Sequence, residues 1–220
     1  MFLGLTLQQV TKTYGRHRLF GPLDVTFTGP GIMGIVGPNG AGKSSFLKMC
    51  AGYTAPTTGQ MAWTYDGKSF TDRQWVQTHS MLTGPYVEPL LELTAQEQID
   101  FHFSLRAPGK KEWIQKALAW SGLEAHLQQK LQYFSSGMLQ KMKLLLALNS
   151  DARFVFLDEP TANLDQAGVD FFHRLLEMTA ENRLILIASN HQTSDLQYCT
   201  QWYVPALGQF QSPEHQNIKQ

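Results

Sequence analysis

The sequence has no excess of charge of either sign. Its 220 residues include 18 Lys and Arg against 18 Asp and Glu, and charged residues make up 16% of the chain. That share is low, since soluble domains usually carry about 25%. A protein that binds the phosphate backbone of a nucleic acid would cluster surplus Lys and Arg. We therefore expect no nucleic acid among the partners.

Cysteines and long apolar runs are also scarce. The two cysteines, Cys50 and Cys199, could pair, but two isolated thiols are more typical of a reducing compartment, and no Cys and His group has metal-ligand spacing. The longest apolar runs, Leu144–Leu148 and Leu184–Ala188, have five residues, whereas a membrane span needs about 20. Met1–Gly4 begins no basic segment leading into an apolar stretch, so no signal peptide is predicted. We expect a cytoplasmic protein that would act at a membrane only through another chain.

The first third of the sequence has the pattern of β-strands. Leu3, Leu5 and Leu7 alternate with small or polar residues, which is typical of a half-buried strand. Two further strands are predicted over Asp24–Thr28 and Ile32–Val36. Only a Gly-Pro-Gly turn separates them, so we expect these two strands to form a hairpin.

The middle of the chain is helical in pattern, and the β/α alternation then resumes. Thr94 and Glu97 have the spacing of a capping box at a helix start. Apolar runs ending at Asp158 and Ala188 predict buried parallel strands. We expect a single domain over residues 1–220. Residues 1–85 and 151–220 would form its core, and residues 86–150 an inserted helical subdomain.

The most specific motif is Gly-Pro-Asn-Gly-Ala-Gly-Lys-Ser over residues 37–44, which fits the phosphate-binding loop G-x-x-x-x-G-K-[ST] in full. Glycines allow the backbone to fold tightly, so that its N–H groups surround a phosphate. A helix is predicted to begin near Gly42, which adds the positive end of its dipole. In this motif Lys43 reaches the terminal phosphates, and the Ser44 hydroxyl binds Mg²⁺.

A second motif is the apolar run Phe154–Leu157 followed by two acidic residues. The run predicts a strand that delivers Asp158 to the carboxyl edge of a parallel sheet, where ligands bind. We expect Asp158 to hold Mg²⁺ and Glu159 to be the general base for an attacking water. Alternatively, the acidic residues after this strand could only cap the start of the next helix. Because the sequence also contains a phosphate-binding loop, we favour the role in metal binding and catalysis.

The order of these motifs resembles that of the ATP-binding cassette (ABC) transporter ATP-binding subunits over nearly the whole chain. Phe134–Met138 looks like a degenerate form of the family's L-S-G-G-Q signature, Asp158–Thr161 matches D-E-P-[ST], and Asn163–Asp165 resembles the D-loop. The resemblance implies an α/β fold: a P-loop NTPase (RecA-like) core, an antiparallel β subdomain and an inserted α-helical subdomain. It also implies hydrolysis of ATP with Mg²⁺ in a dimer, attached to the inner face of the membrane through a separate multi-span chain.

The resemblance carries specific roles onto this sequence. Two copies, most simply a homodimer, would enclose ATP, with the signature of each copy facing the nucleotide of the other. The implied ATP-binding residues are Tyr14 (stacking on adenine), Gly37, Pro38, Asn39, Gly40, Ala41, Gly42, Lys43, Ser44 and Ser45; the metal ligands are Ser44 and Asp158; the residues acting across the dimer are Ser135, Ser136 and Gly137, with Asp165 in the D-loop.

The sequence departs from the family pattern in three places. The signature keeps its Ser and second Gly, but Phe134 replaces Leu, Ser136 replaces the first Gly, and Met138-Leu139-Gln140 stands where Gln would follow directly. No Gln follows the strand predicted to end near Leu82, and Gln77 comes too early. The family's switch His has two candidates here, because Asn190 occupies the expected position and His191 follows it. Slow hydrolysis would be a consequence.

Two other functions compete with transport. A soluble ABC ATPase acting in assembly or remodelling would share every motif, although the long coiled-coil insertions and tandem cassettes of such proteins are missing. A phosphotransferase would share only the phosphate loop. For the transport function, Gly84–Leu91 is the expected docking surface for the membrane chain, with Tyr86 and Leu90 among its exposed apolar side chains.

Overall fold

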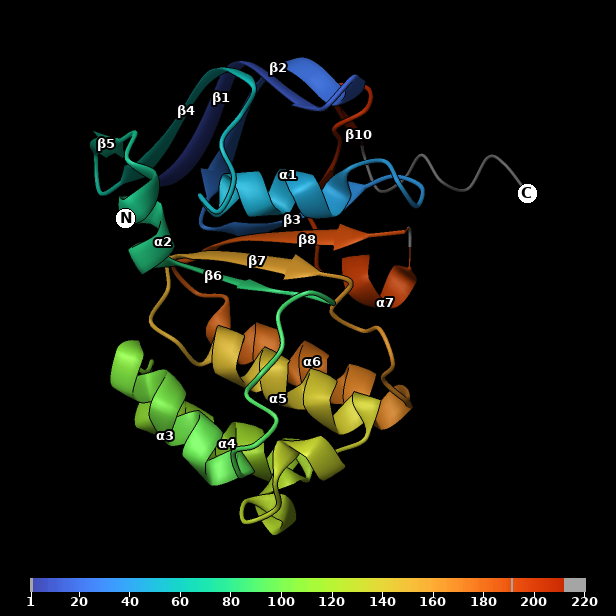
Figure 1. Ribbon diagram of the computed structural model, residues 1–220. Helices are drawn as coiled ribbons and strands as arrows, with labels where there is room; N and C mark the ends of the chain where they lie inside the picture. The colour runs from blue at the N-terminus through green and yellow to red at the C-terminus, as the bar shows by residue number, and fades with distance from the viewer. Residues whose placement is uncertain (1, 191, 212–220) are drawn as a thin grey trace.

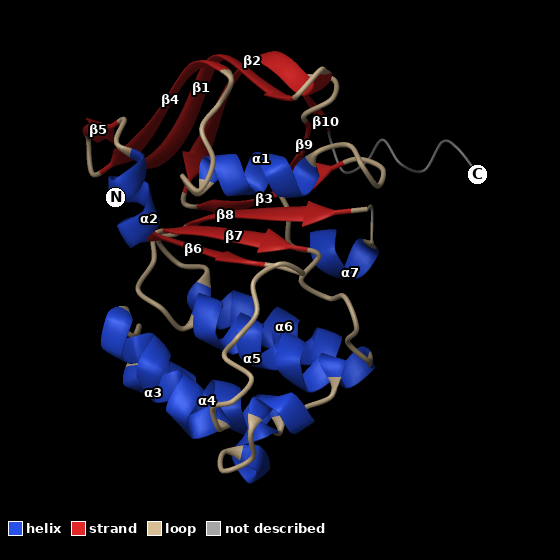
Figure 2. Cartoon of the chain, in the orientation of Figure 1, coloured by secondary structure: helices blue, strands red, loops and turns tan. Residues whose placement is uncertain are grey.

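The computed structural model describes residues 2–190 and 192–211. Two sheets enclose one helix, and further helices cover the outer face of the larger sheet (Figures 1 and 2). The elements are β1 (Leu3–Tyr14), β2 (His17–Gly29), β3 (Gly31–Val36), α1 (Lys43–Cys50), β4 (Thr58–Tyr65), β5 (Lys68–Phe70), α2 (Arg73–His79), β6 (Ser80–Thr83), α3 (Ala95–Leu105), α4 (Lys111–Ser121), the 3₁₀ turns η1 (Leu123–His126) and η2 (Leu131–Tyr133), α5 (Ser136–Leu148), β7 (Phe154–Asp158), α6 (Gln166–Thr179), β8 (Leu184–Ser189), α7 (Thr193–Leu196), β9 (Gln201–Val204) and β10 (Gln209–Gln211).

The larger sheet has six strands in the order β10-β9-β3-β8-β7-β6, and its pairings are parallel except for β10 on β9. Along β7, Phe154 and Phe156 pack into the hydrophobic cluster on the α1 side. Val155 and Leu157 pack into the cluster that contains α5 and α6. Burial on both faces explains why this strand is an unbroken apolar run, and it confirms the predicted buried parallel strands.

The predicted hairpin over Asp24–Thr28 and Ile32–Val36 is wrong. β2 pairs with β1 in the smaller sheet, whereas β3 pairs with β8 and β9 in the larger one. The Gly-Pro-Gly turn therefore carries the chain from one sheet to the other. Four consecutive residues of β3, Met33 to Val36, are buried, a pattern typical of a central parallel strand.

The smaller sheet is antiparallel, in the order β2-β1-β4-β5, and covers α1 from above (Figure 1). Leu3, Leu5 and Leu7 are buried, as their alternation predicts. Phe27 of β2 meets Phe46 of α1 edge-on, with 6.0 Å between ring centroids. This packing fixes α1, and with it the loop that precedes α1, between the two sheets.

The helical segment follows its sequence signals closely. Thr94 forms the complete predicted capping box with Glu97 at the start of α3. Ser135 caps α5, which begins at Ser136. Met142 and Leu145 of α5 share one hydrophobic cluster with strands of the larger sheet, so this helix is packed directly onto the core.

The described elements confirm the α/β class with an antiparallel sheet and a helical part. Over residues 2–190 and 192–211, none of the helices has both the length and the apolar character that crossing a bilayer requires.

Candidate nucleotide-binding site

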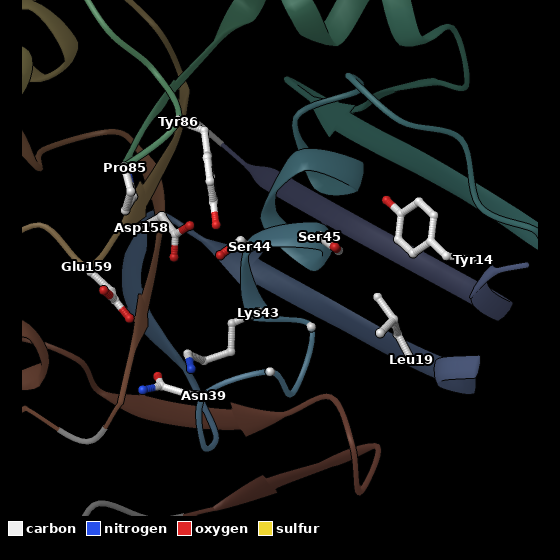
Figure 3. A pocket seen from close by; sticks show the side chains of 12 residues that line it. Tyr14, Leu19, Asn39, Lys43, Ser44, Ser45, Pro85, Tyr86, Asp158 and Glu159 are labelled. Atoms are coloured by element: carbon white, nitrogen blue, oxygen red, sulfur yellow. The ribbon is translucent and has the colours of Figure 1, made fainter. Parts of the chain in front are cut away.

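The phosphate-binding motif forms a loop between the end of β3 and the start of α1, at the carboxyl edge of the larger sheet (Figure 3). Gly40 and Gly42 have φ of 80° and 86°, a left-handed backbone that glycine adopts at low cost. Gly42 is the N-cap of α1 and provides no side-chain cap. The first amides of α1 are therefore available to an anion, which the helix dipole also favours.

Lys43 is buried beneath this loop. Its ammonium donates hydrogen bonds to the carbonyls of Gly37 (2.8 Å) and Pro38 (3.0 Å), and to Oδ1 of Asn190 (2.8 Å). Burial lowers the pKa of Lys43, while the carboxylates of Glu159 and Asp158 act in the opposite direction. A phosphate group at the loop would add a further negative partner for this buried cation.

Of the two switch candidates, Asn190 can be placed, and His191 lies outside the described residues. Because the Lys43 ammonium can only donate, Oδ1 of Asn190 must be the acceptor in their contact. The amide NH₂ of Asn190 then remains a donor for a ligand. Sequence reasoning did not find this contact between residues 147 positions apart.

Ser44 and Asp158 bring a hydroxyl and a carboxylate together at the opposite wall (Figure 3). Burial raises the pKa of the Asp158 carboxyl, and the hydrogen bond from Ser44 acts against that rise. A buried carboxylate paired with a hydroxyl suits Mg²⁺, which prefers oxygen ligands and takes its remaining ligands from phosphates and water. Within the described ranges no group of three or more His, Cys, Asp or Glu could hold a metal.

Glu159 follows in an unusual conformation. Its φ is 49°, a left-handed value that costs a non-glycine residue about 1–3 kcal/mol. Its N–H donates to the carbonyl of Ala188 at 2.9 Å, which ties the end of β7 to β8. The carboxylate points toward the phosphate loop (Figure 3).

These elements enclose an open cavity of about 450 Å³, within the range of small-molecule sites. Tyr14 and Leu19 form its wall at the far end from Asp158 (Figure 3). The Tyr14 ring is half exposed, and the Lys12 ammonium lies 4.9 Å from its centroid. The lining residues are Tyr14, Leu19, Asn39, Gly40, Gly42, Lys43, Ser44, Ser45, Pro85, Tyr86, Asp158 and Glu159.

The signature and D-loop residues occupy helix starts elsewhere in the same chain. Ser135 Oγ accepts from the Met138 N–H at 3.2 Å, and Asp165 Oδ1 accepts from the Gly168 N–H at 2.8 Å. The described residues that line the cavity do not include Ser135, Ser136, Gly137 or Asp165. Their role at the nucleotide of a second copy stays a prediction.

The stretch that lacks the family's Gln contributes an unexpected residue. Gln77 lies in α2 and donates to the carbonyl of Gly52, away from the cavity. Tyr86, which the sequence predicts as part of a docking surface, instead lines the cavity beside Ser44 and Asp158. Tyr86 lies just after β6, where the family has Gln, and this position in the sequence could have indicated that Tyr86 lies at the cavity.

Comparison with known proteins decides the family. A family model described as "ABC transporter" matches residues 20–162. The chain belongs to the ABC transporter family. This membership confirms the resemblance seen in the motifs, and with it the binding and hydrolysis of ATP as the activity of the fold.

The chain is similar to individual known proteins at low sequence identity. The chain is 24% identical over 195 residues to the lantibiotic transport ATP-binding protein SrtF of Streptococcus pyogenes, covering 88% of this chain and 82% of that one. It is 30% identical over 190 residues to the zinc import ATP-binding protein ZnuC 2 of Aliivibrio fischeri, covering 85% and 72%. A solved dimeric ATP-binding cassette with ADP and phosphate superimposes with a TM-score of 0.79 at 18% identity, covering 94% and 98%.

Proposed function

We propose that this chain is the ATP-hydrolysing subunit of an ABC transporter, acting on a separate multi-span membrane chain. The observation that carries the proposal is one cavity whose lining includes Lys43, Ser44, Asp158 and Glu159. These groups supply a cation for phosphate, oxygen ligands for Mg²⁺ and a carboxylate base. Family membership and relatives that are transport ATP-binding proteins support the transport role.

In the proposed reaction, the loop amides and Lys43 hold the phosphates of ATP. Ser44 would bind Mg²⁺ directly and Asp158 through water; the bound ion neutralises charge on the phosphates. Glu159 accepts the proton of the water that attacks the terminal phosphate. The free NH₂ of Asn190 donates to an oxygen of that phosphate, replacing the His of the family with a neutral amide.

We further propose that two copies close around two ATP molecules. In each copy Ser135 begins α5, whose N-terminal end carries partial positive charge. Placed against the partner's terminal phosphate, the Ser135 hydroxyl would donate a charge-assisted hydrogen bond. The dimeric cassette among the structural relatives supports such an arrangement.

The binding step is tested with Lys43→Ala. Direct titration with Mg·ATP should give a much weaker affinity than the unmodified protein, because a buried cation next to the phosphates is lost. Tyr53→Phe, a conservative change at an exposed residue outside the cavity, is the control and should bind normally. Equal affinity of Lys43→Ala and the unmodified protein would contradict the proposed site.

The membrane chain should dock on a smaller groove of about 110 Å³ beside the cavity, at the inner face of the membrane. It is lined by Val87, Glu88, His102 and Lys143, among others, and faces the helical part. Val87 in the lining exposes 38% of its surface, and Leu90, which follows the lining residue Pro89, exposes 48%. An apolar groove with exposed rims suits a short amphipathic helix of a partner.

Docking is tested with Leu90→Asp in membranes that contain the partner. The variant should no longer co-purify with a multi-span chain, while its affinity for Mg·ATP stays normal. Leu207→Asp is the control, since Leu207 is also an exposed leucine (60% against 48% for Leu90) but lies outside the Gly84–Leu91 stretch. Recovery of Leu90→Asp with a multi-span chain would contradict this docking site, and recovery of the unmodified protein with soluble partners alone would favour the remodelling function.

A further inference from the structure

A tight turn holds Tyr86 close to the metal-binding side of the cavity. β6 ends at Thr83, and Gly84 then approaches Asp158 so closely that a Cβ on Gly84 would lie 2.7 Å from the Cβ of Asp158. The Gly84 carbonyl accepts hydrogen bonds from the Val87 N–H (3.2 Å) and from the Lys143 ammonium (3.3 Å). The backbone on either side of Tyr86 is therefore anchored.

The side chain of Tyr86 is held from a second direction. The Lys48 ammonium lies 4.2 Å from its ring centroid. Lys48 is one turn beyond Ser44 on α1, so the ring is fixed over the same helix that presents the Ser44 hydroxyl. Figure 3 shows the phenol group directed toward Ser44 and Asp158, and the same residues line the adjoining small cavity.

The phenol is available for a ligand. Tyr86 exposes 73% of its surface although its ring is restrained, because its outer end projects into the open cavity. A phenol can donate one hydrogen bond and accept another. It lies at the Ser44 and Asp158 end of the cavity, opposite Tyr14, which is the end where the terminal phosphate would lie in the proposed function.

We propose that Tyr86 contacts the substrate in this cavity, as a residue that distinguishes ATP from ADP. Its O–H donates a hydrogen bond to an oxygen of the terminal phosphate. The family's Gln could offer Mg²⁺ the carbonyl oxygen of its side-chain amide, whereas Tyr86 has no such oxygen. The contribution of Tyr86 is therefore a hydrogen bond donated to the negatively charged phosphate. This inference rests on the proposed function of the cavity.

The test is Tyr86→Phe, which removes only the hydroxyl and keeps the ring over Lys48. Calorimetric titration in Mg²⁺ would use ADP and the non-hydrolysable β,γ-imido analogue of ATP. A hydrogen bond to a charged group is lost, so affinity for the analogue should fall about tenfold or more, while affinity for ADP stays the same. Tyr53→Phe is the matched control and should change neither.

A second variant tests the donor itself. Tyr86→Gln restores an N–H donor and should bind the analogue more tightly than Tyr86→Ala does. Persistence of the Tyr86→Phe effect without Mg²⁺ would support direct donation to the phosphate, and its disappearance would contradict it.

Two outcomes are decisive against the inference and can be told apart. If Lys43→Ala weakens binding but Tyr86→Phe behaves as the unmodified protein, the assignment of Tyr86 fails while the site stands. If Lys43→Ala and the unmodified protein bind the analogue equally, the proposed function fails, and the role of Tyr86 fails with it.

Discussion

Ser135→Ala would separate the capping role of this hydroxyl from its proposed role at the nucleotide of a second copy. Ser135 Oγ accepts from the Met138 N–H at 3.2 Å at the start of α5. Loss of such a cap costs about 1 kcal/mol of stability. In a protein of this size that lowers Tm by roughly 2–4 °C, so the variant should remain folded at room temperature.

Thr94→Ala is the matched control. Thr94 caps α3 in the same way, with its hydroxyl accepting from the Glu97 N–H at 3.2 Å, and its loss should cost a similar amount of stability. Thr94, however, has no proposed contact with nucleotide. Thermal unfolding would establish that the two variants are equally destabilised.

The decisive assay is dimerisation with Mg·ATP in a Glu159→Gln background, followed by light scattering. Each hydrogen bond from Ser135 to a charged phosphate is worth roughly 1.5–3 kcal/mol, and a symmetric dimer contains two. Ser135→Ala should therefore weaken the dimer by more than about a hundredfold, whereas Thr94→Ala should leave it intact. Equal dimerisation of the two variants would refute the role of Ser135 across the dimer.

Three further predictions concern buried groups. Burial raises the pKa of Asp158 above its ordinary 3.8, so without nucleotide the free energy of unfolding should fall as pH rises above about 4. Asp158→Asn should lose this pH dependence and melt at a higher temperature at pH 7. An unchanged pH dependence in the variant would contradict the buried, raised pKa. Asp195 Oδ1 accepts a hydrogen bond from the N–H of Thr161 at 3.0 Å. In urea unfolding, Asp195→Ala should therefore lower the free energy of unfolding by about 1–3 kcal/mol, and Asp195→Asn, which keeps an acceptor oxygen, should lower it by less. Equal losses in the two variants would contradict the role of this hydrogen bond. Burial raises the pKa of Cys199 to about 12 and that of Cys50 well above its usual range, so a thiol reagent should label both only after unfolding; labelling of the native protein would contradict this burial.

The parts of the site that sequence predicts are those encoded by contiguous residues. The phosphate loop is one run from Gly37 to Ser44, and Asp158 with Glu159 directly follows its strand. The caps of α3 and α5 are local for the same reason, since each hydroxyl accepts from an N–H three residues ahead. Short-range rules of this kind need no knowledge of tertiary packing.

The missed features depend on contacts between distant segments. Whether β3 pairs with β2 or with β8 is decided by burial on both faces of β3, which a short apolar run does not reveal. The contact of Lys43 with Asn190 depends on the order of strands in the larger sheet. Tyr86 enters the cavity because Gly84 allows the turn after β6 to approach Asp158.

The central claim is that Glu159 activates water against ATP held by the phosphate loop. The most direct test is phosphate release by Glu159→Gln with saturating Mg·ATP, alongside the affinity of the same variant for Mg·ATP. The account predicts unchanged affinity and a rate lower by about 10²–10⁴, the usual loss for a positioned base. Turnover close to that of the unmodified protein would contradict it.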